Sequence, residues 1–187
     1  MALPHAILGF LSLEPMTGYD LKTQCFDRSV RYFWSADQAQ IYRTLDKLQQ
    51  EGHIQSELEI QEGKPNRKVY HLTPSGQAVL LAWLKEPQDL PVFKEPFLMQ
   101  LYFSSGLSNE EILKHIQYQK QQHETRLSEY FAIRDQFEEV LDRHPQDPMH
   151  RAHQLQFLTL KFGIQLEELY LKWLDDAAQV IEGPQEH

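Results

Sequence analysis

Cysteine is almost absent from this sequence, since Cys25 is the one cysteine in 187 residues. A single thiol excludes an intramolecular disulfide and fits the reducing conditions of the cytoplasm. Cys25 falls inside a predicted helix, where a packed thiol is favoured over an oxidant sensor. The sequence also lacks an apolar run of about 18 residues, so no membrane-spanning helix is expected. Residues 1–5 lack the basic region and cleavage site of a signal peptide.

Positive charge is scarce, because 18 Lys and Arg stand against 27 Asp and Glu, for a net charge of -9. Residues 1–86 hold nine basic and ten acidic residues, whereas residues 87–187 hold nine and seventeen. The acidic surplus therefore belongs to the second half. It does not exclude nucleic-acid binding by the first half, because exposed charges are screened over about 8–10 Å in physiological salt.

Signs of catalysis and of cofactor binding are also missing. The sequence has no glycine-rich phosphate loop and no Ser, His and Asp constellation. The neighbouring carboxylates of residues 167–168 and 175–176 point about 100° apart on a helix, which predicts a solvated face rather than a catalytic pair. His150 and His153 share a helix face but lack a third ligand, so metal binding is the less favoured alternative. We expect no enzymatic activity, no cofactor and no metal.

Residues 35–48 are the most informative segment. Ser35 followed by Gln38 predicts a capping box and therefore a helix start. Leucine and isoleucine recur at helical spacing and predict one buried side. The other side carries small residues that allow close approach, and polar groups that can pair with base edges. The residues that we expect to contact DNA from this helix are Ser35, Ala36, Ala39, Gln40, Tyr42, Arg43 and Lys47. Alone, the pattern fits an ordinary amphipathic surface helix equally well.

The flanking segments decide between these two interpretations. They predict a helix over 3–13, a helix from the N-cap Thr17 to about Asp27, strands over 54–60 and 68–72, and a helix from Thr73 to about Lys85. Three helices, a β-hairpin and a further helix are the order of a winged helix-turn-helix. We therefore predict a winged helix-turn-helix DNA-binding domain over residues 1–86.

The turn of the predicted hairpin gathers positive charge. Lys64, Arg67 and Lys68 lie close enough together to contact DNA phosphates. Their position favours DNA binding over the alternative, a winged-helix module that binds an acidic protein partner and no specific DNA.

The second half reads as a linker followed by two long helices. Residues 87–107 combine a proline-rich linker with a short apolar helix at 97–103, which we expect to be fully enclosed between the two halves of the chain. Residues 108–187 predict a dimerisation domain of two antiparallel helices, one reaching about Arg143 and the other about Ile181. The last helix carries a coiled-coil-like stripe that we expect to be buried between subunits, namely Leu158, Phe162, Leu166, Leu169 and Trp173. The alternative is a monomer in which this helix packs on residues 3–13.

Five motifs in the first half resemble the PadR family of bacterial transcriptional regulators. They are residues 7–11 (ILGFL), 15–21 (PMTGYDL), 40–45 (QIYRTL), 48–52 (LQQEG) and 63–73 (GKPNRKVYHLT). The second half resembles the longer branch of that family by length and helix pattern. The resemblance implies a mainly α-helical homodimer that binds a palindromic operator, in most cases as a repressor.

The resemblance also implies a small aromatic effector, because members of the family sense phenolic acids. Lys120, His123 and Arg134 fall near an apolar stripe of the first long helix, where basic groups beside aromatic rings suit an aromatic carboxylate. The alternative, which we favour, is that these long side chains extend to solvent or to acidic neighbours.

Overall fold

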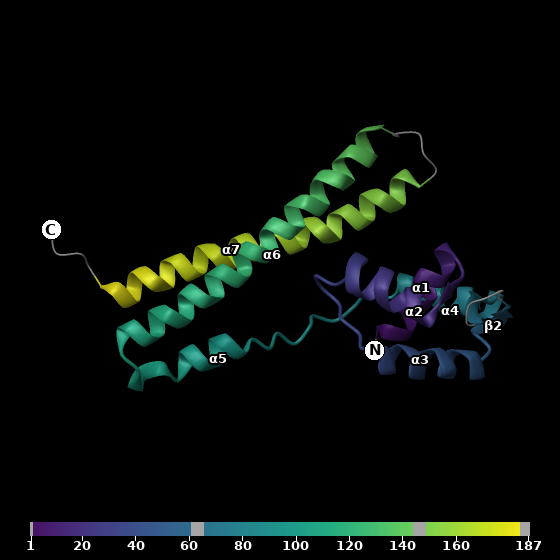
Figure 1. Ribbon diagram of the computed structural model, residues 1–187, viewed down its shortest axis with the longest axis horizontal. Coiled ribbons are helices and arrows are strands. Elements are labelled where there is room, and N and C mark those ends of the chain that lie inside the picture. The colour runs from purple at the N-terminus through teal and green to yellow at the C-terminus, as the bar shows by residue number, and fades with distance from the viewer. Residues whose placement is uncertain (1, 61–65, 144–148, 184–187) are drawn as a thin grey trace. The chain divides into compact units, whose positions relative to one another are not determined.

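The computed structural model describes residues 2–60, 66–143 and 149–183, without the side chains of 140–143. The chain forms two compact units, Met1–Pro91 and Val92–His187. Figure 1 shows short helices and a small sheet in the first unit and long helices in the second. No helix of the described ranges is both long enough and apolar enough to cross a membrane.

The first unit has the predicted winged-helix order. Its elements are α1 (Leu3–Leu13), β1 (Met16–Thr17), α2 (Gly18–Asp20), the π-helix η1 (Leu21–Ser29), α3 (Gln38–Gln50), β2 (Ile54–Glu59), β3 (Arg67–Leu72) and α4 (Pro74–Lys85). The four predicted helical segments and the hairpin are confirmed. The strand β1 and the π-helix are additions that the sequence pattern did not indicate.

The sheet has the order β1-β3-β2 and is antiparallel throughout. In the hairpin, Ser56 pairs with Tyr70. On the other edge of β3, Thr17 pairs with Val69. Because Thr17 is also the N-cap of α2, this short pairing holds the first turn of α2 beside the base of the wing.

The expected helix after Thr17 continues from α2 into the wider π-helix η1. Val30 N–H donates to the carbonyl of Cys25, five residues earlier, and the Ser29 hydroxyl donates to that of Gln24. Hydrophobic periodicity over so short a segment does not separate a π-helix from an α-helix, so the sequence pattern missed it.

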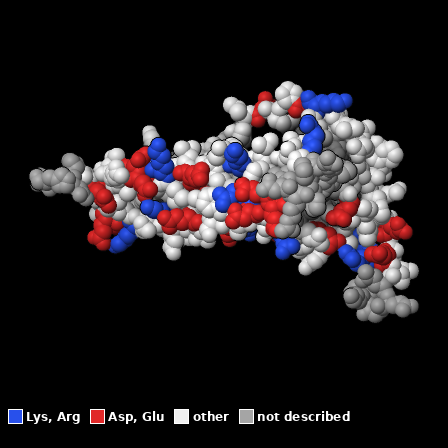
Figure 2. All heavy atoms as spheres, turned by 90° about the horizontal axis from the view of Figure 1, so that it is seen from above, with Lys and Arg blue, Asp and Glu red and all other residues white. Residues whose placement is uncertain are grey.

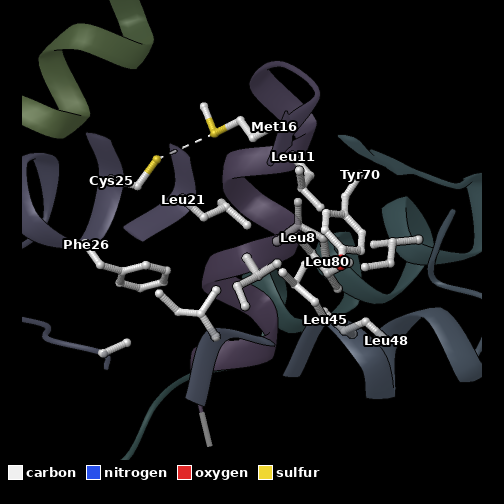
Figure 3. Packing of buried hydrophobic residues seen from close by; sticks show 14 residues of the cluster. Leu8, Leu11, Met16, Leu21, Cys25, Phe26, Leu45, Leu48, Tyr70 and Leu80 are labelled. Carbon is white, nitrogen blue, oxygen red and sulfur yellow. Dashed lines mark hydrogen bonds between the residues drawn. The ribbon is translucent and has the colours of Figure 1, made fainter. Parts of the chain in front are cut away.

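One apolar core holds the first unit together (Figure 3). Leu8 of α1 and Leu45 of α3 are both fully buried, and Tyr70 of β3 packs into the same cluster. The Cys25 thiol is buried with its Sγ 3.6 Å from Sδ of Met16. Burial raises the pKa of Cys25 to about 11, with help from the charges of Glu14 and Asp20, which keeps the thiol protonated.

The second unit consists of α5 (Pro96–Tyr102), the 3₁₀ turn η2 (Ser104–Gly106), α6 (Asn109–Arg143) and α7 (His150–Glu182). The helices α6 and α7 pack along each other as a hairpin (Figure 1). Ser108 caps α6, since its hydroxyl accepts from Glu111 N–H while the Glu111 carboxylate accepts from Ser108 N–H. Asn109 Nδ2 donates to the carbonyl of Ile181, joining the start of α6 to the end of α7.

The short apolar helix α5 is not fully enclosed within its own unit, and its enclosure between the two halves stays a prediction. Phe97 is buried and contacts Trp173 edge-on, with ring centroids 6.2 Å apart. Met99 and Tyr102 are exposed on the other side of α5. This helix of seven residues presents one face to the two long helices of its own unit, which leave the opposite face uncovered.

Candidate nucleic-acid interface

The helix α3 begins two residues later than the sequence pattern indicated. Its N-cap is Asp37, whose Oδ1 accepts from Gln40 N–H at 2.7 Å while Gln40 Oε1 accepts from Asp37 N–H at 3.2 Å. Ser35 therefore precedes the helix and does not cap it. Ala36 is 5% exposed and belongs to the core, so its predicted place on the DNA-facing side is wrong.

The two sides of α3 are otherwise divided as predicted. Ile41, Leu45 and Leu48 are buried against the core. The residues exposed on this helix include Ala39, Gln40, Tyr42, Arg43 and Lys47. The exposed side therefore carries an amide, a guanidinium and an ammonium group on a helix whose other side is fixed by packing.

These exposed polar groups differ in whether they already have a partner within the protein. The Gln40 amide oxygen is engaged in the capping box. Lys47 lies 3.7 Å from a carboxylate oxygen of Glu51, one turn further on. Arg43 forms no ion pair with any residue in the described part of the chain. Its guanidinium is therefore the most available cationic group on α3.

Tyr42 has a structural role beside any contact with DNA. Its ring lies against Gly18, where a Cβ atom would come 2.7 Å from ring atom Cε1. The ring thus joins α3 to the first turn of α2, while 38% of the residue stays exposed. Glycine at position 18 permits this close packing.

The wing residues are placed differently from one another. Lys64 lies outside the described residues. Arg67 Nη2 donates to Asp20 Oδ2 at 2.8 Å. Lys68 Nζ lies 5.0 Å from the centre of the Tyr70 ring and pairs with no carboxylate within the described ranges. Alternating side chains of a strand point to opposite faces, so Arg67 and Lys68 leave β3 on different sides.

Asp20 collects most of the polar contacts at this junction. Its Oδ2 accepts from the Thr17 hydroxyl at 2.7 Å, and its Oδ1 accepts from Gln24 Nε2 at 3.2 Å. Burial by itself would raise the pKa of Asp20, but the hydrogen bonds from Thr17 and the charge of Arg67 outweigh it and hold the pKa below its usual value. The carboxylate is therefore charged at neutral pH.

The predicted dimer stripe lies mostly on the outer side of α7, although Trp173 at its end packs against Phe97 within the unit. Leu158, Phe162 and Leu169 are exposed, whereas Leu166 and Trp173 are half-buried. The side that packs on α6 is a second stripe at the same spacing, formed by Leu160, Ile164, Glu167 and Leu174. The helix α7 therefore has two apolar sides, and its own hairpin covers one of them.

The three basic residues considered for an effector all have acidic neighbours inside the unit. Lys120 Nζ lies 2.6 Å from Asp175 Oδ1, and a hydrogen bond and the charge of that carboxylate raise the pKa of Lys120. His123 Nδ1 lies 2.5 Å from Glu167 Oε2. Arg134 contacts the adjacent Asp135 at 2.8 Å and stacks over an aromatic ring. This pairing fits the favoured alternative, in which these side chains reach acidic neighbours.

The prediction that Glu167 lies on a solvated face is wrong. Glu167 is 4% exposed and faces His123, with Arg126 Nη1 3.3 Å from its second oxygen. The ring of His123 also stacks on Tyr170, with centroids 4.4 Å apart. No group of three potential metal ligands occurs among the residues that the structure describes.

Charge is distributed unevenly over the chain. In Figure 2, acidic side chains with interspersed basic ones cover the surface of the long helices at the left of the view. That surface does not favour a polyanion. Arg43 of α3 and Lys68 of β3, in the first unit, are exposed cations with no acidic partner among the described residues.

A winged helix-turn-helix unit joined to a hairpin of two long helices defines the class of this protein. Residues 7–82 match the family described as "Transcriptional regulator PadR-like family", and residues 93–182 match "Virulence activator alpha C-term". The "Negative transcriptional regulator PadR" of Bacillus subtilis is 32% identical over 96% of this chain and 97% of its own. The chain therefore belongs to the PadR family of transcriptional regulators.

Two solved structures of the same relative are similar along nearly the whole chain. Bacillus subtilis PadR in complex with operator DNA has a TM-score of 0.82 and 32% identity, covering 97% of this chain and 99% of that one. The same protein in complex with p-coumaric acid has a TM-score of 0.75 and 30% identity, covering 98% and 100%. The fold similarity thus includes both units.

Proposed function

We propose that this protein is a homodimeric repressor that binds a palindromic operator through α3. The observation that carries the proposal is the exposed side of α3, where Arg43 lies on a core-anchored helix and has no ion-pair partner among the described residues. The operator complex of the 32% identical relative supports it. We assign the protein to the cytoplasm, where its DNA is, and propose no catalytic activity.

In this proposal α3 enters the major groove. An arginine on such a helix pairs in bidentate fashion with the O6 and N7 atoms of guanine. Gln40 contributes at one end of the helix, and Ala39 lets the backbone approach the bases. Lys47 and Lys68 contact phosphates, which positions the protein without reading sequence. Lys64 is proposed to do the same.

The second subunit is proposed to cover the outer stripe of α7. Exposed apolar side chains in a continuous row are typical of an interface, and a self-complementary helix face suits a two-fold dimer. Two winged-helix units related by a two-fold axis match the two halves of a palindrome. The alternative, a protein-interaction module, would need neither the unpaired Arg43 nor a palindromic site.

We also propose that a small aromatic effector releases the operator. The support is the complex of the Bacillus subtilis relative with p-coumaric acid. The internal pairing of Lys120, His123 and Arg134 means that an effector carboxylate would have to displace an acidic side chain to reach them. We therefore do not assign the effector to these residues.

Replacing Arg43 with alanine should weaken operator binding by about 1–3 kcal/mol and relax base preference at one position of each half-site. Gln40→Ala should have the smaller effect, because its amide oxygen already serves the capping box. Both are measured by fluorescence anisotropy with operator duplexes carrying single base changes. Equal affinity of the parent and Arg43→Ala for every duplex would show that α3 does not read the bases.

A further inference from the structure

We propose that Asp20 is a positioning residue for DNA binding. It holds the Arg67 side chain in an internal ion pair and so keeps it from contacting the phosphate backbone of DNA. This inference rests on the proposed DNA-binding function. It concerns a carboxylate on the first helix of the helix-turn-helix, and it reverses the role that the sequence suggested for Arg67.

The backbone brings the two residues together. The pairing of β1 with β3 places Thr17 opposite Val69, and Arg67 lies two residues before Val69 on the same face of the strand. Asp20 follows Thr17 by one turn of α2. The base of the wing and the start of the helix therefore meet at this point, far apart in sequence but joined by one short ladder.

The Asp20 carboxylate is held in place by contacts other than the one with Arg67. In the capping box, Asp20 N–H donates to Thr17 Oγ1 at 3.0 Å and Thr17 N–H donates to Asp20 Oδ2 at 3.3 Å. The Thr17 hydroxyl also donates to Asp20 Oδ2, at 2.7 Å. Gln24 of η1 holds the other carboxylate oxygen. The Asp20 side chain is 18% exposed, so the contact with Arg67 is partly shielded from water and salt.

The geometry therefore gives the two wing cations different roles. The Arg67 charge is neutralised by a carboxylate that is held in place, and the guanidinium ties the wing to α2 and η1. Lys68 points to the other face of β3, has no acidic partner within the described ranges, and keeps its charge available for a phosphate. The salt dependence of DNA affinity distinguishes a cation that contacts phosphate from one that is paired inside the protein. Each phosphate contact adds about 0.9 to the magnitude of the negative slope of log affinity against log salt.

The test measures that slope for the full-length protein on an unrelated duplex of about 30 base pairs and on the selected operator. Arg67→Ala should leave the slope on unrelated DNA unchanged. Lys68→Ala should make the salt dependence shallower, reducing the magnitude of the slope by about one unit per wing and so by about two for a dimer. Asp20→Asn should make the salt dependence steeper by a similar amount. This variant should also bind non-specific DNA several-fold more tightly and prefer the operator less.

The double variant Asp20→Asn/Arg67→Ala identifies the cause. Its slope should return to the parent value, since the gain in Asp20→Asn comes from the released guanidinium. A gain that persists without Arg67 would mean that Asp20 acts only as a repelling charge, which overturns the proposal. A lower slope in Arg67→Ala would overturn it as well, because Arg67 would then contact phosphate.

Asparagine keeps an oxygen acceptor for Thr17, so the capping box should survive in Asp20→Asn. Urea unfolding of each variant separates loss of fold from loss of positioning, because a destabilised protein binds all DNA less well and cannot gain slope. A parent protein that binds no DNA at all would contradict the proposed function itself. A parent that binds normally beside an Arg67→Ala variant with a reduced slope would contradict only the role of Asp20.

Discussion

Gly76→Ala is expected to lower the free energy of unfolding of the protein by about 3 kcal/mol, at the upper end of the cost of overpacking. A Cβ atom at position 76 would lie 2.1 Å from the carbonyl oxygen of His53 and 2.8 Å from Leu72 Cδ1. The first of these atoms is backbone and is held in place, because His53 O accepts from Thr73 N–H at 3.1 Å. Relief therefore requires α4 to move away from the sheet, and urea unfolding followed by circular dichroism measures the cost.

The matched control for this change is Gly9→Ala, in the middle of α1. Apart from its own stretch of helix, no atom of the described residues lies within 4 Å of a Cβ built there. Helical alanine is favoured over glycine by about 0.5–1 kcal/mol. The control should therefore be neutral or more stable than the parent. If Gly76→Ala unfolds at the same urea concentration as Gly9→Ala, the close approach of α4 to the chain at His53 is wrong.

Glutamate at both Phe162 and Leu169 is expected to abolish tight operator binding. Their residues are 62% and 63% exposed in the single chain, so the hairpin itself should tolerate the change. In a dimer the two carboxylates would be buried without partners, which costs several kcal/mol even after relaxation. The dimer should dissociate at micromolar concentration, and operator affinity should fall by about a hundredfold or more as the second half-site is lost.

Sedimentation equilibrium and operator titration of Phe162→Glu/Leu169→Glu measure both effects. The control carries the same added charge on the polar flank of α7, as Gln154→Glu/Gln179→Glu, and should remain dimeric. A double variant at the outer stripe that stays dimeric and binds the operator as tightly as the parent would show that this side of α7 is not the interface.

The elements of both units were predictable where the sequence pattern is long or carries a strong end signal. Pro4 near the start of α1, Thr17 and Thr73 as N-caps, and Gly52 with a φ of 75° after α3 are local signals that act within one turn. The start of α3 was misplaced because the segment offers two capping boxes, Ser35 with Gln38 and Asp37 with Gln40. In the structure Ala36 is buried in the core and the second capping box, Asp37 with Gln40, is the one that forms. The burial of Ala36 is a tertiary contact that the local sequence does not reveal.

The individual contacts of the site were less predictable. Arg67 lies in a cluster of positive charge that suits phosphates, but its partner Asp20 is 47 residues away in sequence. Glu167 and His123 are 44 residues apart and meet only through the register of the α6–α7 hairpin. One helix read alone reveals which residues share a face, but it does not reveal which residue of another element lies opposite. The partners of these charged side chains could therefore be identified only from the folded structure.

In the proposed function, two copies of this chain bind a palindrome through α3. Selection from random-sequence duplexes at fixed salt, followed by measurement of the mass of the resulting complex, tests it most directly. We expect one enriched palindrome, bound by two chains, whose half-sites lie about one helical turn, or a multiple of it, apart. Recovery of no preferred sequence, or of a site bound tightly by a single chain, would contradict it.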